Sequence, residues 1–277
     1  MDIANRPKPV KPFLRWAGSK RQLLPILSSY WSCQFERYLE PFLGSGSLFF
    51  HLRPRCAVLG DINSGLMEAY KQVRDCLEEV LFELSRMRKG KDQYYRIRSI
   101  DTSSLTASQS AARLIYLNRF AFNGLYRTNR NGEFNVPYGG EKSGNIPKRE
   151  LLAACSSALQ GVSLISGDFE LVLSQASAGD FVYLDPPYSV KARRVFNMYG
   201  PSSFGINDLQ RLRLWLDELT ERGVEFLLSY ARCEEANLLM DGYAATEVTV
   251  RRNIAGFSGS RRRAGEWLIS NKEVSAR

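Results

Sequence analysis

The sequence predicts an α/β protein built on a doubly wound, mostly parallel sheet of the Rossmann-like kind. Short apolar runs alternate with amphipathic helix-length segments at both ends of the chain, which is the pattern of parallel strands joined by crossover helices. With 277 residues, of which 44% are hydrophobic, the chain can form one large domain that carries an insertion. A net charge of +9 favours a polyanionic partner.

The first part of the chain predicts two strand–loop–helix units. In order, we expect a helix over 20–30, a strand over 38–42, a glycine loop over 44–46, a helix from Ser47, and a strand over 57–60 that ends at Asp61. Glycines between a strand and a helix let the backbone approach a ligand and expose amides at the helix start. The third glycine of a pyrophosphate loop is absent, so a nucleoside site is favoured over a pyrophosphate site.

The middle of the chain has a different texture. Apolar spacing predicts helices over 66–88 and 110–120. Between residues 122 and 147 Asn, Gly and Arg dominate, and we expect exposed loops and a hairpin there that do not bury a core. A catalytic domain of residues 1–65 and 156–277 is therefore expected to be split by a mostly helical inserted domain of residues 66–155.

The last part of the chain returns to alternating strands and helices. Strands are expected over 162–165, 181–184, 226–230, 245–250 and 266–269, and helices over 151–159, 169–175, 207–222 and 234–240. This alternation resumes the sheet that the insertion interrupts.

The segment Asp185-Pro186-Pro187-Tyr188 follows the apolar strand 181–184 directly. Two prolines stop further pairing and fix the backbone, at the strand end where open α/β sheets bind ligands. A carboxylate, a proline carbonyl and an aromatic ring together suit an amino group on a flat ring: the oxygens hold its hydrogens, the carboxylate stabilises positive charge, and Tyr188 can stack. The alternative is a strand-ending turn with an incidental Tyr.

Three further positions suit a nucleoside ligand, and each has a structural alternative. Asp61 ends a strand, where a carboxylate often holds ribose hydroxyls, or it is a turn or cap residue. Trp16 and Lys20 flank the turn Gly18-Ser19, although Trp is also a common core residue. Asp168-Phe169 begins a helix, with Phe169 in the core as the alternative.

Several classes of site and location are disfavoured. The five cysteines are scattered singly and the only histidine, His51, follows apolar residues on an expected helix, so neither a metal site nor a disulfide framework is indicated. The N-terminal residues 1–12 lack the apolar segment of a signal peptide, and no apolar run is long enough to span a bilayer. We expect a cytoplasmic protein.

Taken together, the motifs resemble the Dam-like DNA adenine methyltransferases, which use S-adenosylmethionine. The resemblance rests on the ordered segments at 16–20, 40–47, 60–63, 123–139, 167–170 and 185–188. It extends from about Phe13 to Ile269 and implies transfer of a methyl group to the amino group of an adenine flipped out of double-stranded DNA, without a metal.

The resemblance also implies roles for particular residues. The catalytic set would be Asp185, Pro186 and Tyr188, and the cofactor set Trp16, Lys20, Glu40, Phe42, Gly44, Gly46, Asp61, Asp168, Phe169 and Asp185. The DNA-binding set would be Arg15, Phe122, Asn123, Leu125, Arg127, Pro137, Arg251, Arg252 and Arg261. Residues 66–155 would be the target-recognition domain.

The sequence departs from the family pattern at a few positions, of which position 15 contacts a base in that pattern. Arg15 and Ser19 stand where Lys and Gly are common, and Gly140-Glu141 replaces a more basic or aromatic pair. GATC is the leading recognition sequence on the Leu125 and Arg127 matches. Methylation of RNA adenine or another planar amine, or a non-catalytic DNA-binding relative, are the alternatives. The sequence leaves open a role beside a restriction nuclease, in repair or in a phage.

Overall fold

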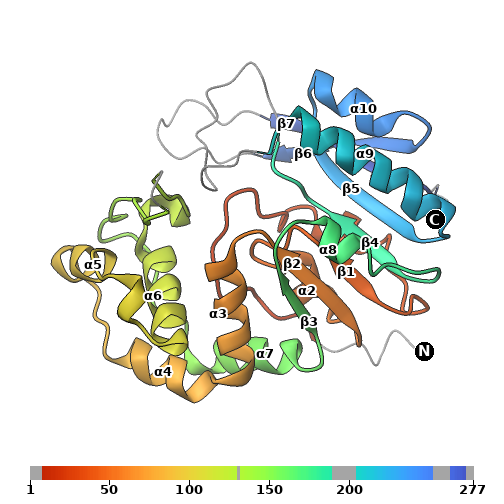
Figure 1. The fold of residues 1–277 in the computed structure, drawn as a ribbon. Coiled ribbons are helices and arrows are strands. Elements are labelled where there is room, and N and C mark those ends of the chain that lie inside the picture. Colours follow the sequence, from red (N-terminus) through yellow and green to blue (C-terminus); the bar gives the residue numbers. More distant parts are fainter. Residues whose placement is uncertain (1–7, 130–131, 189–203, 252–262, 273–277) are drawn as a thin grey trace.

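The computed structural model describes residues 8–129, 132–188, 204–251 and 263–272. One seven-stranded sheet runs through it in the order β3-β2-β1-β4-β5-β7-β6 (Figure 1). The strands are β1 (Tyr38–Glu40), β2 (Ala57–Asp61), β3 (Ser163–Ser166), β4 (Phe181–Leu184), β5 (Glu225–Ala231), β6 (Ala244–Arg251) and β7 (Arg263–Ser270). β1 to β5 pair in parallel, whereas β7 runs antiparallel between β5 and β6. The predicted fold class is confirmed.

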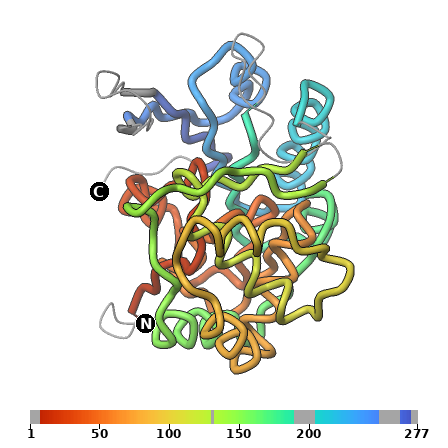
Figure 2. The backbone as a smooth tube through the Cα atoms, turned by 90° about the vertical axis from the view of Figure 1, so that its left-hand side faces the viewer, coloured from red at the N-terminus to blue at the C-terminus, as the bar shows by residue number. Residues whose placement is uncertain are grey.

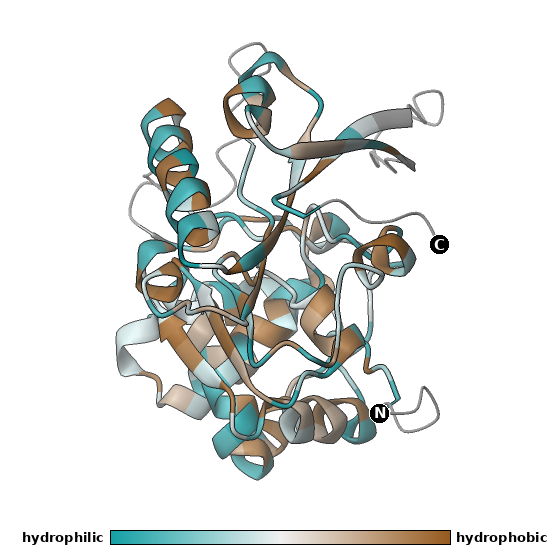
Figure 3. Ribbon diagram, turned by 90° about the vertical axis from the view of Figure 1, so that its right-hand side faces the viewer, coloured by the Kyte–Doolittle hydropathy of each residue, from teal (hydrophilic) through white to brown (hydrophobic). Residues whose placement is uncertain are grey.

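Alternating side chains place the sheet between two hydrophobic cores. On β4, Phe181 and Tyr183 enter one core while Val182 and Leu184 enter the other, because successive strand residues point to opposite faces. The first core contains residues of α2 (Ser47–Leu52), α3 (Ser64–Asp75) and α7 (Arg149–Leu159). The second core contains residues of α8 (Glu170–Leu173), α9 (Ile206–Glu221), η4 (Glu234–Ala236) and α10 (Asn237–Met240). Coloured by hydropathy, the strands are largely apolar and α9 is amphipathic (Figure 3).

A group of helices lies beside α3, away from the sheet (Figures 1 and 2). It comprises α4 (Leu77–Ser85), α5 (Lys91–Arg98), η2 (Thr102–Ser104), α6 (Ala107–Phe120) and η3 (Phe122–Gly124). The core of the first sheet face continues into these helices through α3 and α7. The expected domain limits at 65/66 and 155/156 fall within α3 and α7, and the division into two domains stays a prediction. No helix in the described residues is long and apolar enough to span a membrane.

Two predicted helices have different limits in the structure. The helix expected over 20–30 is only α1 (Leu24–Leu27), because Lys20 lies in the preceding turn, with its ammonium directed to the carboxylates of Asp185 and Glu266. The helix expected over 66–88 is two helices, α3 and α4, because Cys76 has φ −130° and ψ 45°. α5 was not predicted.

The segment 122–147 is less exposed than its composition predicts. Val136 is 1% exposed and belongs to the core, with Phe134 and Tyr138 packed against it. The Val136 carbonyl accepts hydrogen bonds from the Tyr94 hydroxyl and the Arg98 guanidinium. The prediction that this segment buries no core was wrong, because α5 supplies the partners that satisfy its backbone.

Asn118 on α6 joins the helical group to the chain segment before the first helix. Its side chain accepts from the Arg15 amide at 2.8 Å and donates to the Arg15 carbonyl at 2.6 Å. Asn118 is 1% exposed, so few water molecules can replace these bonds. This one side chain therefore fixes the position of residues 15 and 16 relative to α6.

We predict that Asn118→Ala lowers the free energy of unfolding by about 1–3 kcal/mol for each buried backbone group that loses its partner. The measurement is urea denaturation of the full chain. Glu79→Ala, at an exposed site on α4, is the control and should change stability by less than about 0.5 kcal/mol. Equal midpoints for Asn118→Ala and the wild type would contradict this account.

Candidate active site

The carboxyl ends of three parallel strands meet at one edge of the sheet. β1 leads into the glycine loop, β2 ends at Asp61, and β4 is followed by Asp185. β1 and β4 are the neighbours at which the strand order reverses. Ligands of open α/β sheets bind at such a reversal, beyond the carboxyl ends of the strands. The structure thus brings the predicted Asp185 and glycine-loop motifs together.

Lys20 lies at the centre of a buried charged group, here called the Lys20 cluster, with Asp185, Tyr188 and Glu266. The Lys20 ammonium is 2.7 Å from Asp185 Oδ1 and 3.7 Å from Glu266 Oε2, and it donates to the Tyr188 hydroxyl at 2.8 Å. The Tyr188 hydroxyl in turn donates to Glu266 Oε1 at 3.2 Å. The Lys20 and Glu266 side chains are only 5% and 6% exposed, so water screens their charges weakly.

The protonation states of the Lys20 cluster follow from these contacts. Burial alone would lower the pKa of the Lys20 amine, but Asp185, with Tyr188, Tyr183 and Glu266, raises that pKa well above its ordinary value. Burial raises the pKa of the Tyr188 phenol, with Asp185 and Glu266 adding to the effect. At neutral pH Lys20 is therefore cationic and Tyr188 keeps its proton, as the direction of their hydrogen bond requires.

Asp185 is held on one carboxylate oxygen. Its Oδ1 receives the Lys20 ammonium and the Ser229 hydroxyl, the latter at 3.2 Å. Ser229 on β5 also exchanges a hydrogen bond with the Tyr183 hydroxyl at 3.1 Å. The Asp185 side chain is 22% exposed, so this carboxylate is fixed in orientation and still reachable from solvent.

Asp61 shapes the glycine loop. Its Oδ2 accepts from the Gly44 amide and its Oδ1 from the Asn63 amide, both at 2.9 Å. Burial raises the pKa of the Asp61 carboxyl, and the two amides oppose that rise. Gly44 has φ +48°, and a Cβ there would lie 2.7 Å from Trp16 Cδ1, so only glycine fits. Gly46 at the start of α2 also has a positive φ, of 61°.

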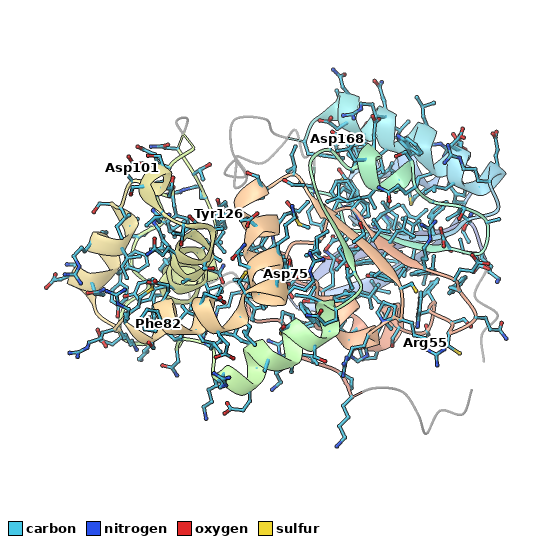
Figure 4. The ribbon with its side chains drawn as sticks, turned by 60° about the horizontal axis from the view of Figure 1, so that its bottom comes forward. Arg55, Asp75, Phe82, Asp101, Tyr126 and Asp168 are labelled. Carbon is cyan, nitrogen blue, oxygen red and sulfur yellow. The ribbon has the colours of Figure 1, made fainter. Side chains whose placement is uncertain are left out.

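Trp16 stands between the glycine loop and the helical group. Its ring stacks on Tyr126 with centroids 5.3 Å apart and 23° between the planes. Burial raises the pKa of the Tyr126 phenol, and the nearby side chain of Asn63, beside Asp61, opposes that rise. In Figure 4, Tyr126 lies between the helical group and α3. The structure therefore connects the loop that follows η3 with the predicted cofactor side of the sheet.

An aromatic group lies beside the same sheet edge. Phe42 is 5.4 Å from Phe169 between ring centroids, and Phe204 is 5.8 Å from Phe42. Arg211 of α9 lies over the Phe169 ring at 4.8 Å and pairs with Asp168 at 2.7 Å. Asp168 is partly exposed near α8 and α9 (Figure 4).

Glu40 is placed differently from the other carboxylates of the site. It is 3% exposed, and its Oε2 accepts from the Tyr38 hydroxyl at 2.8 Å. Burial raises the pKa of the Glu40 carboxyl well above its ordinary value, the Tyr38 hydrogen bond opposes this rise, and the negative charges of Asp185 and Asp61 add to it. Glu40 therefore holds a proton at pH values where an exposed Glu is ionised.

The expected DNA-binding residues fall in three groups. The Arg15 side chain is exposed and passes close to Gly124 and Gly144. The second group lies on the segment after α6 and comprises Phe122, Asn123, Leu125, Arg127 and Pro137. Phe122 and Pro137 are exposed, and Asn123 has a φ of 56°. The Nε of Arg127 donates a hydrogen bond to the Asn135 side chain at 2.7 Å. Arg251 ends β6, while Arg252 and Arg261 lie outside the described residues.

Four residues at the site were not singled out from the sequence: Tyr126, Arg211, Ser229 and Glu266. Glu266 and Ser229 carried a usable signal, because each is a polar residue inside a segment predicted to be a buried strand. Burial of Glu in a strand requires a partner. Tyr126 and Arg211 have no comparable signal, since aromatic residues in loops and arginines on helices are common.

Two features define a Rossmann-like methyltransferase. One is the strand order, with the antiparallel β7 between β5 and β6, and the other is the Asp-Pro-Pro-Tyr segment at the point where the strand order reverses. Residues 16–254 match the model of the family described as D12 class N6 adenine-specific DNA methyltransferase. The chain belongs to this family, and it is an S-adenosylmethionine-dependent DNA adenine methyltransferase. The resemblance found in the sequence is confirmed.

Relatives align over nearly the whole chain. A type II methyltransferase M1.LlaDCHI of Lactococcus lactis is 35% identical, covering 95% of this chain and 95% of its own length. A type II methyltransferase M.MjaIII of Methanocaldococcus jannaschii is 33% identical, with 95% and 99% covered. A DNA adenine methylase of Escherichia coli is 30% identical, with 95% of each chain covered.

We predict a pH signature for Glu40. A carboxyl whose pKa is raised in the folded state stabilises the fold fully below its ordinary pKa, about 4.3, and loses that contribution as pH rises toward the folded value. Glu40→Gln is neutral throughout, so its stability relative to wild type should increase between pH 5 and pH 8. Urea unfolding at both pH values tests this, with exposed Glu79→Gln as control. A pH-independent difference would refute it.

Proposed function

We propose that the chain methylates the exocyclic amino group of an adenine flipped out of double-stranded DNA, with Asp185, the Pro186 carbonyl and Tyr188 around the reacting nitrogen. The observation that carries the proposal is the orientation and partial exposure of the Asp185 carboxylate. Its described contacts, from Lys20 and Ser229, fall on Oδ1, and its side chain is partly exposed. The other oxygen is thereby oriented to accept a hydrogen bond from an incoming amino group.

The residues at the sheet edge fit S-adenosylmethionine. Asp61, Asp168 and Asp185 surround the edge with acidic groups, which suits a ligand that bears a sulfonium and an ammonium. The paired rings of Phe42 and Phe169, beside Asp168, suit a flat adenine with an amino group. The glycine loop, whose conformation Asp61 fixes, gives backbone access for the methionine portion, and Trp16 and Lys20 border it. Glu40, bonded to Tyr38, would support the loop from beneath.

The bound cofactor supplies a methyl group on a positively charged sulfur. The amino nitrogen of adenine is a poor nucleophile because its lone pair is delocalised into the ring. Two oxygens that accept its hydrogens favour the pyramidal form, in which the lone pair forms the new N–C bond while the S–C bonding electrons stay on sulfur. Positive charge then develops on nitrogen beside Asp185, which stabilises it until the nitrogen releases one proton to solvent.

Flipping is part of the proposal because an adenine inside a duplex cannot reach a carboxylate at the end of a strand. The DNA would lie across the segment after η3 and the arginines near the end of β6. Exposed Phe122 and Pro137, and the side chain of Arg15, belong to this face. Arginine pairs with phosphate oxygens and with guanine through two parallel hydrogen bonds. A functional pairing with a restriction nuclease would fit the type II methyltransferase names of two relatives.

We propose GATC as the recognition sequence, with Arg127 reading a guanine. The Arg127 guanidinium is oriented by Asn135 through Nε, at 2.7 Å. An arginine guanidinium can pair with guanine O6 and N7 through two parallel hydrogen bonds. Leu125, half-buried beside it, would contact a thymine methyl group.

We predict that Asp185→Asn reduces single-turnover methyl transfer by at least about a hundredfold, the scale on which losing one transition-state group acts. Asn keeps the size of Asp and an acceptor for Lys20, so the buried ammonium retains a neighbour and the fold is expected to persist. Transfer of labelled methyl groups to duplex DNA measures the rate, and thermal melting monitors folding. Near wild-type transfer by a folded Asp185→Asn would sink the proposed function.

We predict that Arg127→Ala relaxes selectivity within GATC, because loss of a bidentate pair removes about 1–3 kcal/mol of discrimination. Single-molecule sequencing of plasmid DNA methylated by each protein gives the modified sites. The control is Arg55→Ala, because Arg55 is exposed and lies away from Tyr126 and the helical group (Figure 4). Arg119 is unsuitable as a control because it donates to the Asn145 carbonyl. Modified adenines confined to another motif would refute GATC and leave the catalytic proposal intact.

A further inference from the structure

Glu266 is a buried carboxylate that the proposed reaction does not use. It lies on the antiparallel strand β7, paired in register with Ala231 of β5, and it is 4% exposed. Its two oxygens face the Tyr188 hydroxyl and the Lys20 ammonium, at 3.2 and 3.7 Å. The Lys20 ammonium also contacts Asp185, and Tyr188 belongs to the same Asp-Pro-Pro-Tyr segment as Asp185. Glu266 therefore touches Tyr188, one of the groups proposed to surround the reacting nitrogen, and the ammonium that pairs with Asp185.

The charges of the Lys20 cluster explain why a second carboxylate is needed. Lys20 lies only 2.7 Å from Asp185, and at that distance a buried ammonium cancels most of the carboxylate's field. Lys20 and Asp185 alone would sum to zero. Lys20, Asp185 and Glu266 together sum to −1, so the cluster still attracts the positive charge that develops on an attacking amino nitrogen.

We propose that Glu266 is a positioning residue for methyl transfer: it balances the charge of Lys20, so that Asp185 faces the adenine amino group as an effective anion, and it holds the Tyr188 hydroxyl. The proposal rests on the proposed function of Asp185. Glu266 acts through Lys20 and Tyr188, whereas Ser229 contacts Asp185 directly.

The charge-balance account makes the effect of Glu266 depend on Lys20. With Lys20 present, removal of the Glu266 charge leaves Asp185 neutralised. With Lys20 replaced by a neutral side chain of similar length, no ammonium lies beside Asp185, so the Glu266 charge has no cation to balance. The two substitutions should therefore be strongly non-additive, as expected for residues that share one network.

The test is a double-mutant cycle on the full chain, with Glu266→Gln and Lys20→Met separately and together. Single-turnover methyl transfer is measured at saturating S-adenosylmethionine and duplex DNA, and cofactor affinity is measured separately. We expect Glu266→Gln to slow transfer at least about tenfold with less than about a threefold change in cofactor affinity. In the Lys20→Met background the same change should cost less than about twofold.

Glu247→Gln is the matched control. Glu247 lies on the neighbouring strand β6, opposite Trp267, and its exposed side chain pairs with Arg232 at 3.1 Å. The same loss of charge at that site should leave transfer within about twofold of wild type. An equal loss from Glu247→Gln would show a general effect of charge and overturn the assignment to Glu266.

Every remaining outcome also decides the proposal. Wild-type transfer by Glu266→Gln overturns it, as does a loss of equal size in both Lys20 backgrounds. If Glu266→Gln alone fails to fold, the pair of variants that lack the Lys20 charge still gives the answer, because those two variants differ only in the charge at position 266: a cost below about twofold supports the proposal and a tenfold cost overturns it. Asp185→Asn, assayed in parallel, separates the two levels, since an active Asp185→Asn sinks the proposed function itself.

Discussion

The contact between the Lys20 ammonium and Asp185 organises this molecule's reactive edge. A buried ammonium is costly unless several anionic or polar groups surround it, and the groups that do so here come from separate parts of the fold. Asp185 and Tyr188 follow β4, and Glu266 belongs to β7. Because one ammonium requires all of them nearby, the strand ends and the turn before α1 are fixed together.

The antiparallel strand β7 has a chemical consequence as well as a structural one. By lying between β5 and β6 it brings Glu266 next to Ala231, at the carboxyl end of β5, and within reach of Tyr188. A parallel strand in that place would begin at the edge of the sheet where β5 begins, so the residues in its first half would lie far from Asp185. The reversed direction therefore allows the last strand in the chain to deliver a carboxylate to the edge at which β1, β2 and β4 also end.

Much of this arrangement could be predicted, and the limits of prediction have physical causes. Phe181–Leu184 is buried at every position, so it appears in the sequence as a continuous apolar run, and Asp185 stands out at its end. The environment of Lys20 could not be predicted, because its partner Tyr188 is 168 positions away and Glu266 a further 78. Local patterns carry no information on such contacts, and the same reason led to the overlong helix assigned to residues 20–30.

Arg15 and Trp16 join the two sides of the molecule through consecutive residues. Asn118 holds the Arg15 backbone from the helical side, while Trp16 packs on Gly44 and stacks on Tyr126. A shift of the loop that carries Tyr126 would therefore reach Trp16 and the glycine loop directly. The proposed DNA-facing segment and the proposed cofactor loop share one short, rigid connection, whereas each also has its own core contacts.

Tyr188 shows how the site can be organised before a base arrives. Its hydroxyl is held by Lys20 and Glu266, and its ring meets Tyr230 edge to face, with centroids 5.3 Å apart. A ring fixed at the hydroxyl and along one edge has little freedom to reorient, so stacking of a base on it would cost little side-chain entropy. The same hydrogen bonds that fix the ring also fix the ammonium beside Asp185. The proposed base stacking and the proposed charge stabilisation therefore depend on one set of buried contacts, and a change in any member of that set should affect both.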